Sequence, residues 1–211
     1  MTASPSLRWP TLVFDLDGTL VDTIGLIVAS YQHAFRTVLG HEEDEARIRA
    51  WIGRPLVRCF QEAAPDHADE LFAAYTAWNE ANTDAMVRSY AGVADLLGDL
   101  AAAGARVAVA TSKRRPPAVR ALELTRLTDL VPVVVTMEDT AVHKPDPTPL
   151  LLAVQRVGGE PGRAAYIGDA VVDVRAAHAA GMAGIGVLWG AGTEADVRAA
   201  APHAVLSLIH I

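Results

Sequence analysis

Two aspartates separated by one residue follow an apolar run near the start of the chain. Residues 11–14 form that run, and Asp-Leu-Asp-Gly-Thr-Leu follows it as residues 15–20. Alternate residues of an extended segment point to the same side, so Asp15 and Asp17 are expected to leave the end of the strand together. Two carboxylates this close repel each other and lose hydration unless a cation or a reaction requires them. The pair indicates a metal or catalytic site, although an acidic turn is the alternative for this segment alone.

Three more polar groups follow further along the chain. The segment 111–113 (Thr-Ser-Lys) comes after one apolar run, and Asp169 comes after another, with Asp173 one helical turn later. The third group contains Lys144, in the segment 143–147 that leads into a predicted helix. In open parallel sheets, ligands bind beyond the carboxyl ends of the strands. The four groups are therefore expected around one crevice.

This set of side chains combines a cation site with an anion site. Asp15, Asp169 and Asp173 offer hard oxygen ligands of the kind that Mg²⁺ prefers, with water completing its octahedron. The Thr111 hydroxyl and the backbone N–H groups after it can bind a phosphate oxygen, and Lys144 offers a point charge to the same anion. With its charge neutralised by Mg²⁺ and lysine, a phosphate can be attacked by a carboxylate.

Each of these groups has a plainer interpretation when it is taken alone. Lys144 and the proline after it can simply begin a helix, since proline suits the first helical turn. Thr111 and Ser112 can cap the next helix, and Asp169 with Asp173 can form a turn and a solvated helix face. Their joint occurrence, in an order that one crevice can gather, favours a shared site.

Apolar runs and helical periodicities alternate along most of the chain. Predicted strands cover residues 11–14, 106–110, 131–135, 164–167, 184–188 and 204–208. Predicted helices between them cover residues 92–103, 116–124, 147–157 and 172–180. This alternation, with nearly continuous apolar strands, predicts an α/β fold with a Rossmann-like parallel sheet and helices on both faces.

The stretch between the first two strands contains only helical patterns. Helices are expected between Asp22 and Gly40, from Pro55, and over residues 66–84. Roughly 65 residues of helix exceed what a crossover connection needs. The pattern predicts an inserted all-helical cap at residues 21–89, joined by two short hinge strands to a catalytic core at 1–20 and 90–211.

Composition limits the partners of this chain. Its 211 residues are 51% hydrophobic and 20% charged, which fits a folded core rather than disorder. A net charge of −7, with Lys and Arg scattered, argues against nucleic acid or an anionic membrane as a partner. Residues 1–5 lack the apolar core of a signal peptide, and one cysteine excludes an internal disulfide. We therefore expect a cytoplasmic monomer or homodimer whose partner is a small molecule.

Taken together, the four groups resemble the signatures of the haloacid dehalogenase-like hydrolase superfamily. The matching segments, in order, are Asp-Leu-Asp-Gly-Thr-Leu (15–20), Ala-Thr-Ser-Lys (110–113), Lys-Pro-Asp-Pro (144–147) and Gly-Asp-Ala-Val-Val-Asp (168–173). Segments 135–139 and 179–190 resemble its subgroup of phosphoglycolate phosphatases and inorganic pyrophosphatases. The similarity covers nearly the whole chain, including the helical cap.

The resemblance implies catalytic and metal-binding roles for four aspartates. Asp15 would be the nucleophile and would form an aspartyl-phosphate. Asp17 would protonate the leaving oxygen and later take a proton from water, which is acid–base help typically worth ~10²–10⁴-fold. Asp15, the backbone carbonyl of Asp17 and Asp169 would hold Mg²⁺, with Asp173 near the site.

It also implies residues that bind the substrate. Thr111 and Lys144 would bind the transferring phosphoryl group, together with Ser112. Gly18 would permit the tight turn that brings N–H groups close to it. Arg54 lies in a segment that resembles the cap loop facing the crevice, where it could clamp a carboxylate or a second phosphate. A solvated arginine at a helix start is the alternative.

Single positions separate the reactions known in this superfamily. Asp17 favours phosphoryl transfer, since dehalogenases lack the second acid, and Ile27 stands where the resembling phosphomutases carry histidine. No lysine precedes Lys113, so phosphonate hydrolysis through a Schiff base on the cap is disfavoured. We predict a Mg²⁺-dependent phosphatase that hydrolyses a small, phosphoglycolate-like metabolite. An inorganic pyrophosphatase is the alternative, and a catalytically idle regulatory protein is a distant one.

Overall fold

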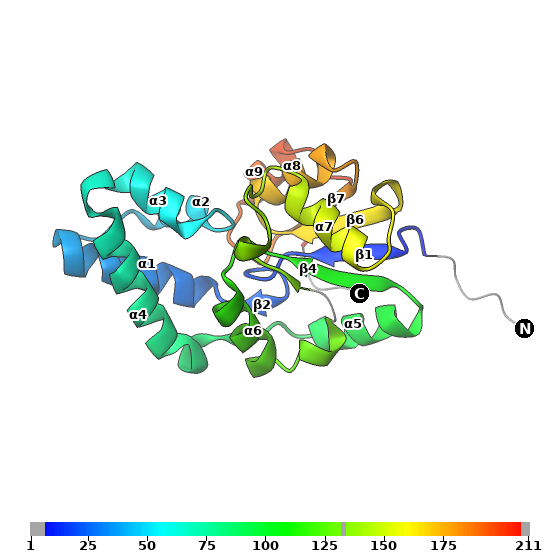
Figure 1. Cartoon of the computed structure of the whole chain (residues 1–211), viewed down its shortest axis with the longest axis horizontal. Coiled ribbons are helices and arrows are strands. Elements are labelled where there is room, and N and C mark those ends of the chain that lie inside the picture. The colour runs from blue at the N-terminus through cyan, green and yellow to red at the C-terminus, as the bar shows by residue number, and fades with distance from the viewer. Residues whose placement is uncertain (1–6, 132–133, 208–211) are drawn as a thin grey trace, which may run out of the picture.

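The computed structural model describes residues 7–131 and 134–207, and a six-stranded parallel sheet lies at its centre (Figure 1). The strand order is β5-β4-β1-β6-β7-β8. The strands are β1 (Thr11–Phe14), β4 (Arg106–Ala110), β5 (Val134–Val135), β6 (Ala164–Gly168), β7 (Ala183–Val187) and β8 (Ala204–Leu206). The predicted α/β fold class is confirmed.

Alternate residues of the central strands pack against helices on opposite faces of the sheet. Phe14 and Val109 belong to the apolar cluster of α5 and α6, whereas Val13 and Tyr166 belong to that of α7 and α8. These helices, with α9 and two 3₁₀ turns, are α5 (Val93–Ala102), α6 (Arg115–Leu124), α7 (Thr148–Arg156), α8 (Val171–Ala179), α9 (Glu194–Ala199), η2 (Thr128–Leu130) and η4 (Pro161–Arg163). Burial of both faces explains why the strand sequences are apolar almost throughout.

Four helices between the first and second strands of the sheet form a group of their own, at the left of Figure 1. They are α1 (Ile24–Leu39), α2 (Glu45–Trp51), α3 (Leu56–Ala63) and α4 (Ala68–Met86), with the 3₁₀ turn η1 (Pro65–His67). A separate apolar cluster that includes Phe35, Phe60 and Leu71 holds them together. We call α1–α4 the cap helices; the division at residues 20/21 and 89/90 stays a prediction.

An antiparallel ribbon connects the cap helices to the sheet. It consists of β2 (Val21–Asp22) and β3 (Arg88–Ser89), in which Val21 pairs with Ser89. The first predicted helix begins slightly later than expected, because Asp22 lies in β2 and Thr23 precedes α1. Gly40 ends α1 in the left-handed conformation, with a φ of 74°.

Most other boundaries differ from the sequence prediction by one or two residues. The helices α2 and α9 were missed because each has only about two turns, too few for a visible apolar periodicity. The strand expected at 131–135 is limited to Val134–Val135 among the described residues, and its positions 132 and 133 lie outside them, as does residue 208. No helix in the described ranges combines the length and apolar character needed to cross a bilayer.

A single carboxylate joins two helices to the end of β5. Asp139, in the 3₁₀ turn η3 (Met137–Asp139), accepts hydrogen bonds from the Thr136 N–H at 2.7 Å and hydroxyl at 2.9 Å. It also pairs with Arg115 of α6 and, at 2.8 Å, with Arg156 of α7. Burial disfavours the charged form, but these hydrogen bonds and guanidinium groups outweigh it and lower the pKa of Asp139 to about 2.

Asp139→Asn is expected to lower the free energy of unfolding by roughly 1–3 kcal/mol, since charged hydrogen bonds lose their acceptor. The native pKa lies below the ordinary value of 3.8, so this stabilisation is present above pH 3.8 and is lost as the pH falls towards 2. Urea unfolding followed by circular dichroism, at pH 7 and at steps below pH 4, measures both effects. Asp99→Asn, at an exposed position of α5, is the control. An equal loss of unfolding free energy in that variant would contradict a stabilising role for the Asp139 carboxylate.

Candidate active site

The carboxyl ends of β1, β4 and β6 bring polar side chains together. Phe14, the last residue of β1, pairs with both neighbouring strands. Asp15 therefore lies between the loops that begin at Thr111 and at Asp169. Its own N–H donates to the carbonyl of Ile167 at 2.8 Å, which fixes the start of the loop. The parallel register thus gathers three of the residues predicted to form the site.

Lys144 reaches the same edge from the loop before α7, and it is only 4% exposed. Its Nζ lies 3.0 Å from Asp15 Oδ1 and donates to Asp173 Oδ1 at 2.7 Å and to the Tyr166 hydroxyl at 3.0 Å. Burial disfavours the ammonium, but Asp15 and Asp173 outweigh it and hold the pKa of Lys144 well above its usual value. Because the Tyr166 hydroxyl donates to the Ala110 carbonyl at 2.7 Å, it can only accept from the lysine.

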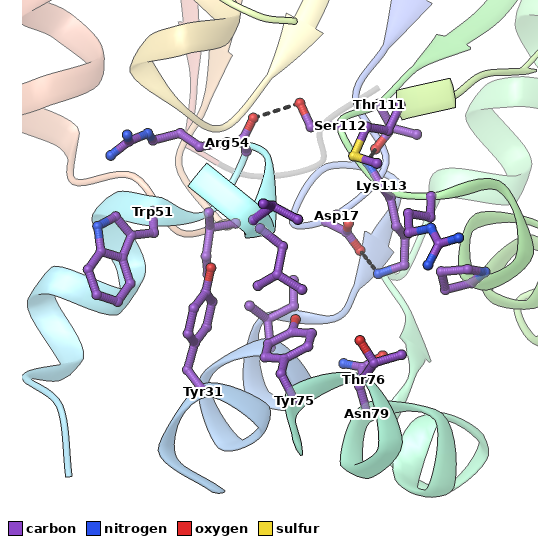
Figure 2. A pocket seen from close by; sticks show the side chains of 18 of the residues that line it. Asp17, Tyr31, Trp51, Arg54, Tyr75, Thr76, Asn79, Thr111, Ser112 and Lys113 are labelled. Atoms are coloured by element: carbon purple, nitrogen blue, oxygen red, sulfur yellow. Dashed lines mark hydrogen bonds and ion pairs between the residues drawn. The ribbon is translucent and has the colours of Figure 1, made fainter. Parts of the chain in front are cut away.

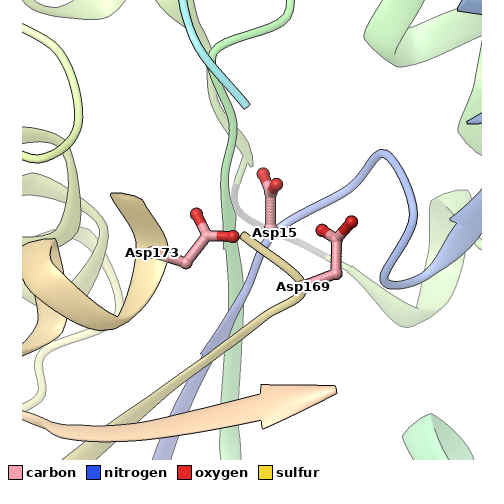
Figure 3. Close-up of side chains that lie close together, drawn as sticks. All are labelled: Asp15, Asp169 and Asp173. Carbon is pink, nitrogen blue, oxygen red and sulfur yellow. The ribbon is translucent and has the colours of Figure 1, made fainter. Parts of the chain in front are cut away.

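Three buried carboxylates lie close together at this edge of the sheet (Figure 3). One oxygen each of Asp15, Asp169 and Asp173 lies within 4.8 Å of the others. Burial, with the neighbouring carboxylates, raises the pKa of Asp15 to about 7, although Lys144 opposes the shift. Burial and the charges of Asp173 and Asp15 likewise raise the pKa of Asp169 to about 8. Lys144 pairs with Asp15 and Asp173, and Asp169 has no ion pair among the described residues, so negative charge is in excess.

This donor set fits a hard divalent cation. Asp15 Oδ1 is buried and forms no aligned hydrogen bond within the described residues, even though the Lys144 ammonium is close to it. Asp173 is more fully engaged, since Oδ1 accepts from Lys144 and Oδ2 from the Ala170 N–H at 2.9 Å. Asp169 accepts hydrogen bonds from neutral groups alone among the described residues, and Asp15 shares the Lys144 ammonium with Asp173, so these two carboxylates have the greatest need of a cation. The predicted acids could hold a metal ion, with Asp173 orienting the lysine.

Asp169 lies in a cradle that the sequence reasoning did not identify. Its Oδ1 accepts from the Thr19 hydroxyl at 3.2 Å and its Oδ2 from the Ala191 N–H at 2.6 Å. Gly18 has a φ of +74°, and a Cβ there would come within 2.5 Å of Oδ2. A Cβ at Gly190 would overlap the same carboxylate. The glycines after β7 are the local signal that could have revealed this role.

The second aspartate of the pair has different partners from the first. Asp17 Oδ1 accepts from the Thr23 hydroxyl at 2.7 Å and from Lys113 Nζ at 2.9 Å. Figure 2 shows the Asp17 carboxylate and the Lys113 ammonium meeting at one side of a pocket. Lys113 therefore balances the charge of Asp17, while Lys144 serves Asp15.

Asp15 and Asp17 both line a cavity of about 240 Å³ between the sheet edge and the cap helices. Thr111 and Ser112 line it as well. The Ser112 hydroxyl donates to the Gly53 carbonyl at 2.8 Å, which ties the loop after β4 to the cap (Figure 2). Carboxylates, a hydroxyl and backbone groups thus face a shared space large enough for a small molecule.

Arg54, the predicted clamp for a second anion, also lines this cavity. Its guanidinium pairs with Glu62 at 2.5 Å, and in Figure 2 it is directed away from Asp17. The arginine side chain is 30% exposed and its partner 54%, so the pair contributes little to stability. A clamping role requires Arg54 to leave Glu62, and it stays a prediction.

Comparison with known proteins assigns a family to this fold and site. Residues 12–187 match the family model described as haloacid dehalogenase-like hydrolase. The chain belongs to the haloacid dehalogenase-like hydrolase family. All four sequence segments that suggested the family lie inside the matched region. The prediction of a hydrolase of this family is confirmed.

Relatives of this hydrolase cover most of its length. Pyrophosphatase PpaX of Bacillus velezensis is 36% identical over 182 residues, which are 86% of this chain and 84% of the relative. Probable phosphatase IndB of Dickeya dadantii is 35% identical over 204 residues, or 93% and 89% of the two chains. The crystal structure of a hydrolase from Pseudomonas syringae superimposes with a TM-score of 0.84 at 25% identity, covering 92% of both chains.

Gly190→Ala is expected to displace the Asp169 carboxylate, because the added methyl group overlaps it. Such strain typically costs ~1–3 kcal/mol, which urea unfolding at pH 7 measures as a lower midpoint. Gly162→Ala is the matched control, since a Cβ there meets nothing within 4 Å. Equal stability of the two variants would contradict the cradle.

Proposed function

We propose that this hydrolase is a Mg²⁺-dependent phosphatase that transfers a phosphoryl group from a small metabolite to Asp15 and then to water. The observation that carries this proposal is the Asp15 carboxylate, whose Oδ1 lies without an aligned hydrogen bond beside the Lys144 ammonium. A carboxylate oxygen with an uncommitted lone pair can attack phosphorus, and a nearby cation reduces its repulsion of an anionic phosphate.

In the first step an oxygen of Asp15 attacks phosphorus, and the bond to the leaving oxygen breaks. Lys144, at 3.0 Å from Asp15, offsets the charge that collects there. The Thr111 hydroxyl, with the Ser112 N–H and backbone N–H groups of the loop that turns at Gly18, would bind the oxygens of the phosphoryl group, while the Ser112 hydroxyl stays on the Gly53 carbonyl. Mg²⁺ held by Asp15, the Asp17 carbonyl and Asp169 would supply positive charge between the two anions.

Asp17 would act on protons in both halves of the reaction. It lines the cavity beside Asp15, and its side chain is 13% exposed. In its protonated form it would give its proton to the leaving oxygen, and it would then take a proton from the water that attacks the aspartyl-phosphate. Thr23 and Lys113 hold the carboxylate in place through Oδ1.

For the substrate, phosphoglycolate-like esters are the first candidates from the sequence and pyrophosphate is the second. The PpaX relative, which is 36% identical, is named a pyrophosphatase, and this name favours pyrophosphate. The name of the IndB relative supports only a phosphatase. We place this chemistry in a cytoplasmic monomer or homodimer, as predicted from the sequence.

Asp15→Asn is expected to reduce phosphate release by about 10³-fold or more, because the amide cannot form the acyl-phosphate. A phosphate-release screen with Mg²⁺, over phosphoglycolate, pyrophosphate, sugar phosphates and nucleotides, measures it. Circular dichroism checks the fold. Asp84→Asn, in an exposed ion pair on α4, should retain wild-type rates. Near-normal turnover by the Asp15 variant would exclude it as the nucleophile.

Mg²⁺ binding is expected to stabilise the folded protein, since it relieves repulsion among Asp15, Asp169 and Asp173. At about 100 times its Kd, a ligand adds ~2.7 kcal/mol to the free energy of unfolding. Thermal unfolding with MgCl₂, with EDTA and with NaCl of equal ionic strength measures this effect. Asp169→Asn should lose the Mg²⁺-dependent rise in Tm, while Asp84→Asn should keep it. A rise retained by the Asp169 variant would contradict the assignment.

A further inference from the structure

The cavity next to Asp15 has a wall that the phosphoryl chemistry does not use. This wall belongs to the cap helices and the loop after α2, and most of its residues are aromatic or branched apolar. They include Ile27, Tyr31, Trp51, Ile52, Phe72 and Tyr75. The carboxylates of Asp15 and Asp17 therefore lie on the sheet side of the cavity, and the apolar side chains lie on the opposite side.

The aromatic rings of this wall are held rigidly before any ligand arrives. The Tyr31 centroid lies 5.4 Å from that of Trp51 and 5.0 Å from that of Tyr75, the latter in an edge-on arrangement. Tyr31 and Trp51 are only 3% and 4% exposed. Figure 2 shows the Tyr31 and Tyr75 rings rising from the cap helices with their hydroxyl ends towards the pocket. A preformed wall binds a flat group with little loss of side-chain entropy.

The positively charged side chains that line this cavity already have acidic partners. Each arginine and lysine that lines it is in an ion pair with an acid of the chain. These pairs are Lys113–Asp17 at 2.9 Å, Arg54–Glu62 at 2.5 Å and Arg114–Glu138 at 3.3 Å. A second anionic group on the substrate would compete with Asp17, Glu62 or Glu138 for these cations, and it would lose hydration against the rings. An uncharged leaving group meets neither penalty.

We infer that the preferred substrate is a phosphate monoester of an uncharged alcohol that carries an aromatic or other flat apolar group. This inference rests on the proposed phosphatase function. The phosphoryl group would lie at Asp15, and the apolar group would lie among the aromatic and branched side chains of the cap wall. An apolar cavity of about 150 Å³ holds a benzene ring, so 240 Å³ accommodates a ring together with the ester.

The test compares 2-phenylethyl phosphate with ethyl phosphate, whose alcohols have similar acidity, so that the chemical step is matched between them. Phosphoglycolate and the anhydride pyrophosphate serve as the competitors that carry a second anionic group. With Mg²⁺ and the full-length chain, kcat/KM is measured for 2-phenylethyl phosphate, ethyl phosphate, phosphoglycolate and pyrophosphate. The phenyl ester is expected to exceed each of the others by ~10-fold or more, the size typical of filling an apolar pocket. Turnover of phosphoglycolate or pyrophosphate that equals or exceeds that of the phenyl ester would overturn the inference.

Variants at Tyr75 connect the preference to the wall. Tyr75→Ala is expected to reduce the ratio of kcat/KM for the phenyl and ethyl esters by about 10-fold, whereas Tyr75→Phe, which keeps the ring, should retain it. A ratio unchanged in Tyr75→Ala, with the fold intact by circular dichroism, would also overturn the inference. If Tyr75→Ala does not fold, Phe72→Ala tests the same wall.

The Asp15→Asn variant separates this inference from the function on which it rests. Phosphate release from all four compounds that is equal in wild type and Asp15→Asn would overturn the proposed function itself. Release that depends on Asp15 but shows no preference for the phenyl ester would overturn only the substrate class.

Discussion

The excess of negative charge at the end of β1 is the constraint on which the rest of this site depends. Asp15, Asp169 and Asp173 are buried together, and the Lys144 ammonium pairs with Asp15 and Asp173. Burial and mutual repulsion make full ionisation of such a cluster unfavourable. A cation between two of these carboxylates removes the difficulty. The buried carboxylates therefore favour the binding of a cation at the place where the proposed reaction occurs.

Holding such a cluster in place requires a rigid frame. The parallel register of β1, β4 and β6 fixes the loops, and backbone or hydroxyl donors fix the side chains. Around Asp169 the frame is so close that Gly18 and Gly190 have no room for a Cβ. Tyr166 supports Lys144 in a similar way, because its hydroxyl accepts a hydrogen bond from the lysine. Since a small displacement can cost much catalytic efficiency, these supports matter as much as the acids they hold.

The cavity divides two tasks between two parts of the chain. The sheet edge supplies charged groups and orients them, whereas the cap helices supply an apolar aromatic wall. The Ser112–Gly53 hydrogen bond joins the two parts at the cavity itself. Changes in the cap helices can therefore alter substrate choice without disturbing the charge arrangement at the sheet.

Local sequence patterns were enough to predict the fold class and the edge at which Asp15, Thr111 and Asp169 meet. Apolar periodicity is a local property, and parallel strands carry the residues after them to one edge. The partners of each side chain depend on the folded chain: Asp173 orients Lys144, and Arg54 pairs with Glu62. The tertiary structure also revealed the glycine cradle and the aromatic wall. These features arise from contacts such as Thr19 with Asp169, 150 residues apart in the chain, which no local pattern encodes.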